Sequence, residues 1–195
     1  MQDLRSILDS YKDCTVTFVG SRKVTRQGLS IGLQAKEILL KNRCIFRSGN
    51  ALGFDQIVSM YVPVSHREIY LPYQRFGPAG SELVDGIVLD TRGHTYAKAQ
   101  QFVYQCHPCH EKLKQHHLRY LIRDVYQVLG KDLQHPSSVV VCWTPDGAET
   151  AAECTRQTGG TGMAIRIANA FGIPVVNLKR QKEISKLEER ENEMC

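Results

Sequence analysis

Short strand-like and helix-like segments alternate in the first third of the chain, and this alternation restricts the fold more than any other feature. The strand-like segments are rich in β-branched and aromatic residues, while the segments between them repeat apolar residues at helical spacing. After a short amphipathic helix at 2–12, strands are predicted at 15–20, 44–49 and 65–72, and helices at 28–42 and from about 50 to 61. This order builds a parallel sheet with right-handed crossovers.

The same alternation returns near the end of the chain. The segment "SSVVVCWT" at 137–144 is almost continuously apolar, as expected of a strand at the centre of a parallel sheet. A glycine-rich turn and a helix follow, with Gly172 as the predicted end of the helix, and 173–178 is the last predicted strand. Together these segments predict an α/β fold with a mostly parallel sheet.

The region between the two halves has a different pattern. Residues 73–93 contain glycines, a proline and the short apolar run "GIVLD", and residues from about 95 to 130 are polar and helical. Because this stretch is longer than a simple crossover needs, we expect a helical insertion at about 95–130 that covers the site or packs against a partner. Residues 1–178 then form a single domain, followed by a charged tail at 179–195.

The composition is that of an ordinary globular protein. The chain has 195 residues, of which 42% are hydrophobic and 23% charged, and no apolar run reaches the roughly 18–20 residues that span a membrane. The first ten residues lack the apolar core of a secretory signal, so we expect a cytoplasmic protein without a membrane partner. The formal net charge of +5 suits anionic small molecules and does not by itself indicate DNA binding.

Two polar loops, "VGSRKVT" and "SGNALGFDQ", follow the first two predicted strands. Arg22 can donate to a phosphate or carboxylate, and Asp55, at the start of the next helix, can contact a ribose or act as a catalytic carboxylate. Each loop also has a simpler interpretation, as an exposed turn in the first case and a helix cap at Asp55 in the second. The candidate binding residues in these loops are Gly20, Ser21, Arg22, Ser48, Gly49 and Asp55.

A third loop, "TGGTG", lies between the central strand and the last predicted helix. Free N–H groups at a helix N-terminus with glycines before it favour an anion, although the sequence is neither a Walker loop nor GxGxxG. Trp143, at the end of the preceding strand, either stacks on a base or is a core aromatic. The candidate phosphate-binding residues are Gly159, Gly160, Thr161 and Gly162. All three loops follow strands of a parallel sheet, so they are expected to converge on one crevice.

These loops resemble the SLOG superfamily, a Rossmann-like group. It includes the lysine-decarboxylase-like phosphoribohydrolases, the DNA-processing protein A family and the YspA/YpsA-type proteins. "SGNALGFD" is similar to the "SGxAxGxD" signature of the DNA-processing branch, and "GGTGMAIRIA" to the glycine-rich loop of the superfamily. The match covers roughly 15–72 and 137–178, and the middle section resembles an insertion found in relatives of that branch. The resemblance implies a doubly wound, Rossmann-like α/β fold and a nucleotide or nucleotide-derived ligand across these loops. We expect no cofactor besides this ligand.

One departure from the resemblance concerns catalysis. The phosphoribohydrolases carry "PGGxGTxxE", whose Glu takes part in cleaving the N-glycosidic bond, but here that position falls on Ile165 or Arg166. Neither side chain can act as a general base, and Arg166 instead can reach a phosphate from one turn into the helix. Asp55, Glu149 and Glu153 are the possible substitutes, with Asp55 and Glu153 as the tentative catalytic pair, and both glutamates also suit a solvated loop.

Three functions therefore stay open. The first is binding of a nucleotide or nucleotide-derived small molecule, as a sensor or a sequestering protein, which the missing Glu favours. The second is hydrolysis of nucleoside monophosphates at the N-glycosidic bond. The third is single-stranded DNA binding of the DNA-processing type, for which a charge of +5 without clustering is neutral. The resemblance also implies a homo-oligomer that pairs through helices.

The segment "CHPCHEKLKQHH" at 106–117 concentrates cysteine and histidine. It offers weak zinc ligands, but a second C-x2-C pair is missing, and surface histidines on polar helices are the simpler interpretation. Alternatively, His116, Arg119 and Arg123 share one helical face through i, i+3, i+7 spacing and present positive charge to the ligand. The weak zinc candidates are Cys106, Cys109, His110 and His116.

Overall fold

The computed structural model describes residues 3–77 and 85–181 and contains a six-stranded sheet in which all strand pairs are parallel. The order across the sheet is β4-β3-β2-β1-β5-β6. The strands are β1 (Thr15–Gly20), β2 (Ile45–Ser48), β3 (Arg67–Leu71), β4 (Gly86–Val88), β5 (Val139–Trp143) and β6 (Val175–Asn177). This arrangement confirms the predicted Rossmann-like α/β fold.

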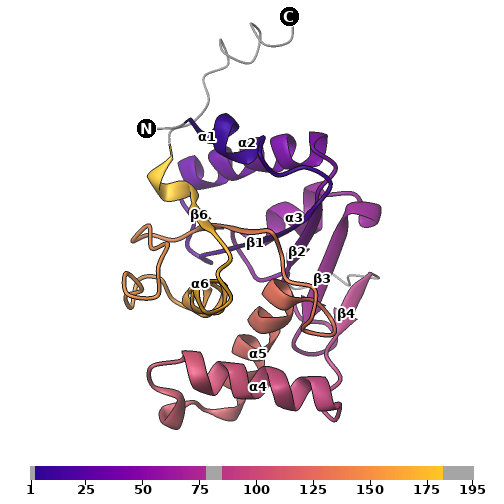
Figure 1. The fold of residues 1–195 in the computed structure, drawn as a ribbon, viewed down its shortest axis with the longest axis vertical. Coiled ribbons are helices and arrows are strands. Elements are labelled where there is room, and N and C mark those ends of the chain that lie inside the picture. Colours follow the sequence, from indigo (N-terminus) through magenta and orange to yellow (C-terminus); the bar gives the residue numbers. More distant parts are fainter. Residues whose placement is uncertain (1–2, 78–84, 182–195) are drawn as a thin grey trace, which may run out of the picture.

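Helices cover both faces of this sheet and make a three-layer molecule (Figure 1). One face carries α1 (Leu4–Leu8), α2 (Arg26–Lys41) and α3 (Gln56–Tyr61), and the other carries α4 (His94–Cys106), α5 (Gln115–Leu129) and α6 (Thr161–Ala170). Three short 3-10 turns complete the described elements, at η1 (Val64–His66), η2 (His110–Lys112) and η3 (Leu178–Arg180). None of the helices described is long and apolar enough to cross a membrane.

Strand β5 shows why the central strands are almost continuously apolar. All of its side chains are buried, because its alternate residues point to opposite faces that are both covered. Val139, Val141 and Trp143 pack in the core under α1–α3, whereas Val140 and Cys142 pack in the core under α4–α6. The run "VVVCW" therefore indicates a strand that is buried between two layers of helices.

The strand order reverses between β1 and β5, which are neighbours in the sheet but far apart in the sequence. Their ends are joined directly, because the Ser21 N–H donates to the carbonyl oxygen of Trp143 at 2.9 Å. From this point the chain leaves β1 toward one face and β5 toward the other. In open parallel sheets, ligands bind at the carboxyl ends of the strands at such a reversal.

The middle of the chain contains one strand that the sequence did not predict. Within the run "GIVLD", Gly86–Val88 forms the edge strand β4. It was missed because three residues beside glycine carry almost no periodicity. Residues 78–84 of this region and 182–195 of the predicted tail lie outside the described residues.

The region predicted as a helical insertion holds two helices with different contacts. Helix α5 packs directly on β1, β2 and β3 and carries the chain back to β5, whereas α4 packs on α5 and α6. Figure 1 shows α4 farthest from the sheet on this side. The amphipathic character of α5 thus comes from a face buried against the sheet, and its exposed flank is free to line a cavity at the strand ends.

Candidate functional site

A cavity of about 340 Å³ lies at the carboxyl ends of β1 and β5, where the strand order reverses. All three loops that the sequence singled out contribute to it, and α5 supplies a further side. The lining residues are Val19, Gly20, Ser21, Arg22, Lys23, Ala51, Asp55, His117, Tyr120, Leu121, Arg123, Asp124, Thr158, Gly159, Gly160, Thr161 and Ala164. The predicted convergence of loops from distant parts of the sequence is therefore present in the structure.

Asp55 holds the first two loops together at the floor of this cavity. It is only 2% exposed, and its Oδ1 accepts a hydrogen bond from the Gly20 N–H at 2.9 Å. The backbone N–H groups of Ala51 and Gly49 also bond to this carboxylate. Although Asp55 precedes α3, its side chain does not cap that helix. The simpler interpretation as a helix cap is therefore wrong, since Asp55 joins the ends of β1 and β2.

Arg123 enters from α5 and pairs with two buried carboxylates. Its Nη1 donates to the Gly49 carbonyl at 2.9 Å and lies 3.9 Å from Asp55 Oδ2, while Nη2 donates to Asp124 Oδ1 at 2.8 Å. Its guanidinium also lies 5.7 Å from the centre of the Phe76 ring. We call Gly20, Gly49, Asp55, Arg123 and Asp124 the charged wall of the cavity.

Burial controls the protonation of this charged wall. It raises the pKa of Asp55, against the charge of Arg123, and it raises the pKa of Asp124 to about 6. Burial alone would lower the pKa of Arg123, but the charges of Asp124 and Asp55 raise it instead. The guanidinium therefore stays charged, and both carboxyl groups hold their protons more tightly than in water.

The opposite side of the cavity is built from exposed backbone. Gly159 adopts φ +63°, a conformation that favours glycine, and a Cβ built on Gly159 or Gly160 would meet no atom within 4 Å. The N-terminus of α6 follows at Thr161, and Gly160 provides no side-chain cap. We call Thr158, Gly159, Gly160 and Thr161 the glycine wall. Its open surface and uncapped helix end suit an anion.

Polar side chains outside the cavity hold the glycine wall in place. Asp146 Oδ2 accepts hydrogen bonds from the Thr158 hydroxyl and, at 2.6 Å, from the Thr155 hydroxyl. Burial would raise the pKa of Asp146, but these hydrogen bonds outweigh it and lower the pKa well below the usual range. An ionised Asp146 thus anchors a long loop that has no regular secondary structure of its own.

Glu149 and Glu153 belong to this supporting structure and do not line the cavity. Arg180 pairs with Glu153 Oε1 at 2.8 Å and with Glu149 Oε2 at 3.1 Å. The hydrogen bond from Arg180, followed by those from two backbone N–H groups, lowers the pKa of Glu153 to about 2. The tentative catalytic pair is therefore not brought together, because Asp55 lies in the cavity and Glu153 on the outside of the loop.

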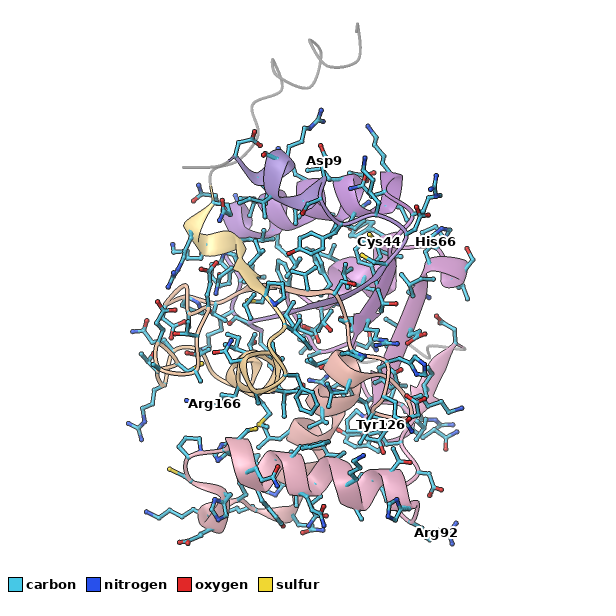
Figure 2. The ribbon with its side chains drawn as sticks, viewed as in Figure 1. Asp9, Cys44, His66, Arg92, Tyr126 and Arg166 are labelled. Carbon is cyan, nitrogen blue, oxygen red and sulfur yellow. The ribbon has the colours of Figure 1, made fainter. Side chains whose placement is uncertain are left out.

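Four other predicted contacts also lie outside the lining. The hydroxyl of Ser48 donates to the Phe18 carbonyl at 2.7 Å, and Gly49 lies beneath Arg123. Gly162 is buried in α6. Arg166 points between α6 and α4, where its charge acts on Cys106 and His107 (Figure 2). In contrast, Gly20, Ser21, Arg22, Asp55, Gly159, Gly160 and Thr161 all line the cavity.

The structure also places the residues that had two interpretations. Trp143 is 3% exposed within the core under α1–α3, so it is a core aromatic. Among residues 3–77 and 85–181, no group of three or more His, Cys, Asp or Glu side chains is placed to hold a metal ion, and this includes the four weak zinc candidates. His116 and Arg119 are exposed and outside the cavity lining, whereas Arg123 lines it.

Sequence reasoning missed the side chains of α5 that face the cavity, His117, Tyr120 and Asp124. These three residues follow i, i+3, i+7 spacing and are shifted by one residue from the predicted face of His116, Arg119 and Arg123. The buried stripe Leu118, Ile122, Val125 and Leu129 was the available signal, because it fixes which flank of the helix is left at the strand ends.

A larger and more open hollow, of about 660 Å³, lies beside β2, β3 and the loop after α5. Its polar side chains pair with one another: Arg47 Nε lies 2.7 Å from Glu68 Oε2, and the Tyr70 hydroxyl donates to the same oxygen at 3.0 Å. It shares no residue with the three loops, so the smaller cavity is the candidate site.

In comparisons with known proteins, this chain matches no family model, no curated protein and no solved structure. The resemblance to the SLOG superfamily therefore stays an expectation that rests on three short motifs.

Proposed function

We propose that this protein binds a nucleotide or a nucleotide-derived small molecule in the cavity at the ends of β1 and β5. The observation that carries the proposal is the glycine wall, where Gly159 and Gly160 leave open space at an uncapped helix N-terminus. That wall shares a cavity with the cationic side chains of Arg22 and Lys23. Backbone N–H groups, a helix dipole and cationic side chains are the usual components of a phosphate site.

The remainder of the cavity suits the nucleoside part of such a ligand. Tyr120 and His117 offer ring surfaces, and Asp124 offers a carboxylate. Ligand cavities commonly measure about 300–1,000 Å³, so a cavity of about 340 Å³ fits one nucleotide better than a larger dinucleotide. A cavity of this size also favours a small molecule over a continuous DNA strand.

Binding is favoured over N-glycosidic hydrolysis by the state of Asp55. The three backbone N–H groups and Arg123 that surround this carboxylate give it a structural task within the charged wall. Glu153, the other tentative catalytic residue, does not reach the cavity. If hydrolysis nevertheless occurs, free base accumulates when the protein is incubated with nucleoside monophosphates, and Asp55→Asn abolishes it.

Isothermal titration against the nucleoside 5′-monophosphates tests the proposal, with inorganic phosphate as a separate probe. We expect saturable binding that weakens about tenfold in Arg22→Gln, because a charge-assisted contact is lost. Arg92→Gln is the matched control, since Arg92 is exposed and lies at the start of α4, away from the cavity (Figure 2). Folded protein that binds none of the nucleotides would contradict the proposal.

A further inference from the structure

Asp124 is the one carboxylate of the charged wall that keeps an oxygen available to a ligand. The residue is 4% exposed and lines the cavity. Its Oδ1 accepts from Arg123 Nη2 at 2.8 Å, whereas within residues 3–77 and 85–181 no hydrogen bond reaches its Oδ2. Asp55, in contrast, is occupied by backbone N–H groups. A ligand that fills the cavity displaces water from this carboxylate, so a ligand that supplies hydroxyl or amino donors to the free oxygen is favoured there.

The position of Asp124 relative to Arg22 indicates which part of a nucleotide it meets. Both residues line the cavity, and the positive charge of Arg22 acts on the Asp124 carboxylate. Asp124 and Arg22 therefore share one cavity, in which Arg22 is placed for the phosphate. In a nucleotide the ribose follows the phosphate directly and the base lies farther away. Asp124 is therefore in reach of the ribose, and Tyr120 is left for the base.

We propose that Asp124 accepts hydrogen bonds from the vicinal hydroxyls of a ribonucleotide and so makes this site selective for ribonucleotides over 2′-deoxyribonucleotides. The inference rests on the proposed function. One carboxylate oxygen has lone pairs for both hydroxyls of a cis-diol, and Oδ1 stays bonded to Arg123, which fixes the plane of the carboxylate. Loss of the 2′-hydroxyl leaves this buried acceptor only partly satisfied.

The experiment compares each ribonucleoside 5′-monophosphate with its 2′-deoxy counterpart by isothermal titration. We expect the ribonucleotide to bind about 10- to 100-fold more tightly, as for loss of a hydrogen bond to a charged group. In Asp124→Asn, which keeps the size of the side chain and an oxygen for Arg123, we expect this ratio to fall by about tenfold. Affinity for the deoxynucleotide should change less, because only the contact to the 3′-hydroxyl is weakened in that complex.

Glu111→Gln is the matched control, because it also removes one carboxylate but lies exposed in η2, outside the cavity. It should leave the ratio unchanged. Equal affinity of the wild-type protein for ribo- and deoxyribonucleotides overturns the assignment of Asp124 and leaves the proposed function intact. Dependence on an amino group of the base, with no effect of the 2′-hydroxyl, overturns it as well. Absence of binding to every nucleotide instead refutes the proposed function itself.

Discussion

The two walls of the cavity are built on opposite principles. The charged wall is a buried network in which Arg123 pairs with Asp55 and Asp124. The glycine wall is exposed backbone, held from outside by Asp146. Breaking the charged wall leaves buried polar groups without partners, whereas a change in the glycine wall touches few protein atoms. The first wall is therefore expected to matter most for folding and the second for binding.

The largest effect is expected from Asp55→Ala. The substitution removes a buried partner of Arg123 and strands the Gly20 N–H, so we expect a loss of about 3–5 kcal/mol of unfolding free energy. Urea denaturation measures it. Asp132→Ala, at an exposed position after α5, serves as the control and should change stability little. A loss below about 1 kcal/mol would mean that the charged wall is not a cooperative buried network.

The second effect concerns pH. The pKa of Asp124 is about 6 in the folded protein and about 3.9 in an unfolded chain. Because the folded state holds the proton more tightly, the stabilising contribution of Asp124 is full below about pH 4 and is lost as the pH rises through about 6. Relative to Asp124→Asn, which does not titrate, the wild type should lose about 2 kcal/mol between pH 4 and 7.

Urea denaturation of both proteins across this range measures the difference, in which the contributions of acids outside the charged wall cancel. A difference that is flat with pH would show that Asp124 titrates normally and that solvent reaches the charged wall.

A pair of glycine substitutions compares the two walls directly. In Gly49→Ala the new Cβ would overlap Arg123 Nη1 and lie 2.5 Å from Gln127 Nε2, so we expect a loss of about 2 kcal/mol. In Gly160→Ala the Cβ meets nothing within 4 Å and φ is −60°, so stability should stay the same or rise by about 0.5 kcal/mol. Nucleotide affinity should nevertheless fall about tenfold in this variant, because a methyl group then stands in the phosphate site. Equal stability losses in the two variants would remove the distinction between the walls.

Asp146→Ala tests how the glycine wall is held. Two hydroxyl donors lose their carboxylate, and we expect about 1.5 kcal/mol of lost stability together with about tenfold weaker nucleotide binding. Asp13→Ala removes an exposed carboxylate that is paired with Arg43 and does not line the cavity, and it is the control. Thermal denaturation and titration report the two effects separately. Unchanged binding would show that Asp146 does not position the glycine loop.

The smallest expected effect is a gain in stability. Both amide atoms of the Gln127 side chain are buried without a hydrogen-bond partner in the described part of the chain. Gln127→Met keeps the length of the side chain and removes these polar atoms, so we expect about 1 kcal/mol of added stability by urea denaturation. A loss of stability instead would show that the amide is satisfied in solution and belongs to the charged wall.

The loops that form the site could be predicted from the local sequence, but the side chains that support these loops could not. Glycines after strands and before a helix identified the loops, since tight turns and close backbone approach leave few other residue choices. Gly53 illustrates this: at φ +91° its Cβ position is 2.6 Å from the Ser21 carbonyl, so the first two loops touch. In contrast, nothing in the local sequence around Arg166 and Glu153 indicates the direction in which their side chains point.

The sequence by itself determined the parallel α/β architecture, because burial on both sides of β1 and β5 imposes continuous apolar strands that local pattern reveals. It also determined that three loops meet at one edge of the sheet. Only the tertiary structure decided that Arg123 from α5 reaches Asp55 and that Asp124 faces the cavity. Those contacts join residues more than 60 positions apart, and they depend on the exact rotation of α5 against the sheet, which no short-range periodicity encodes.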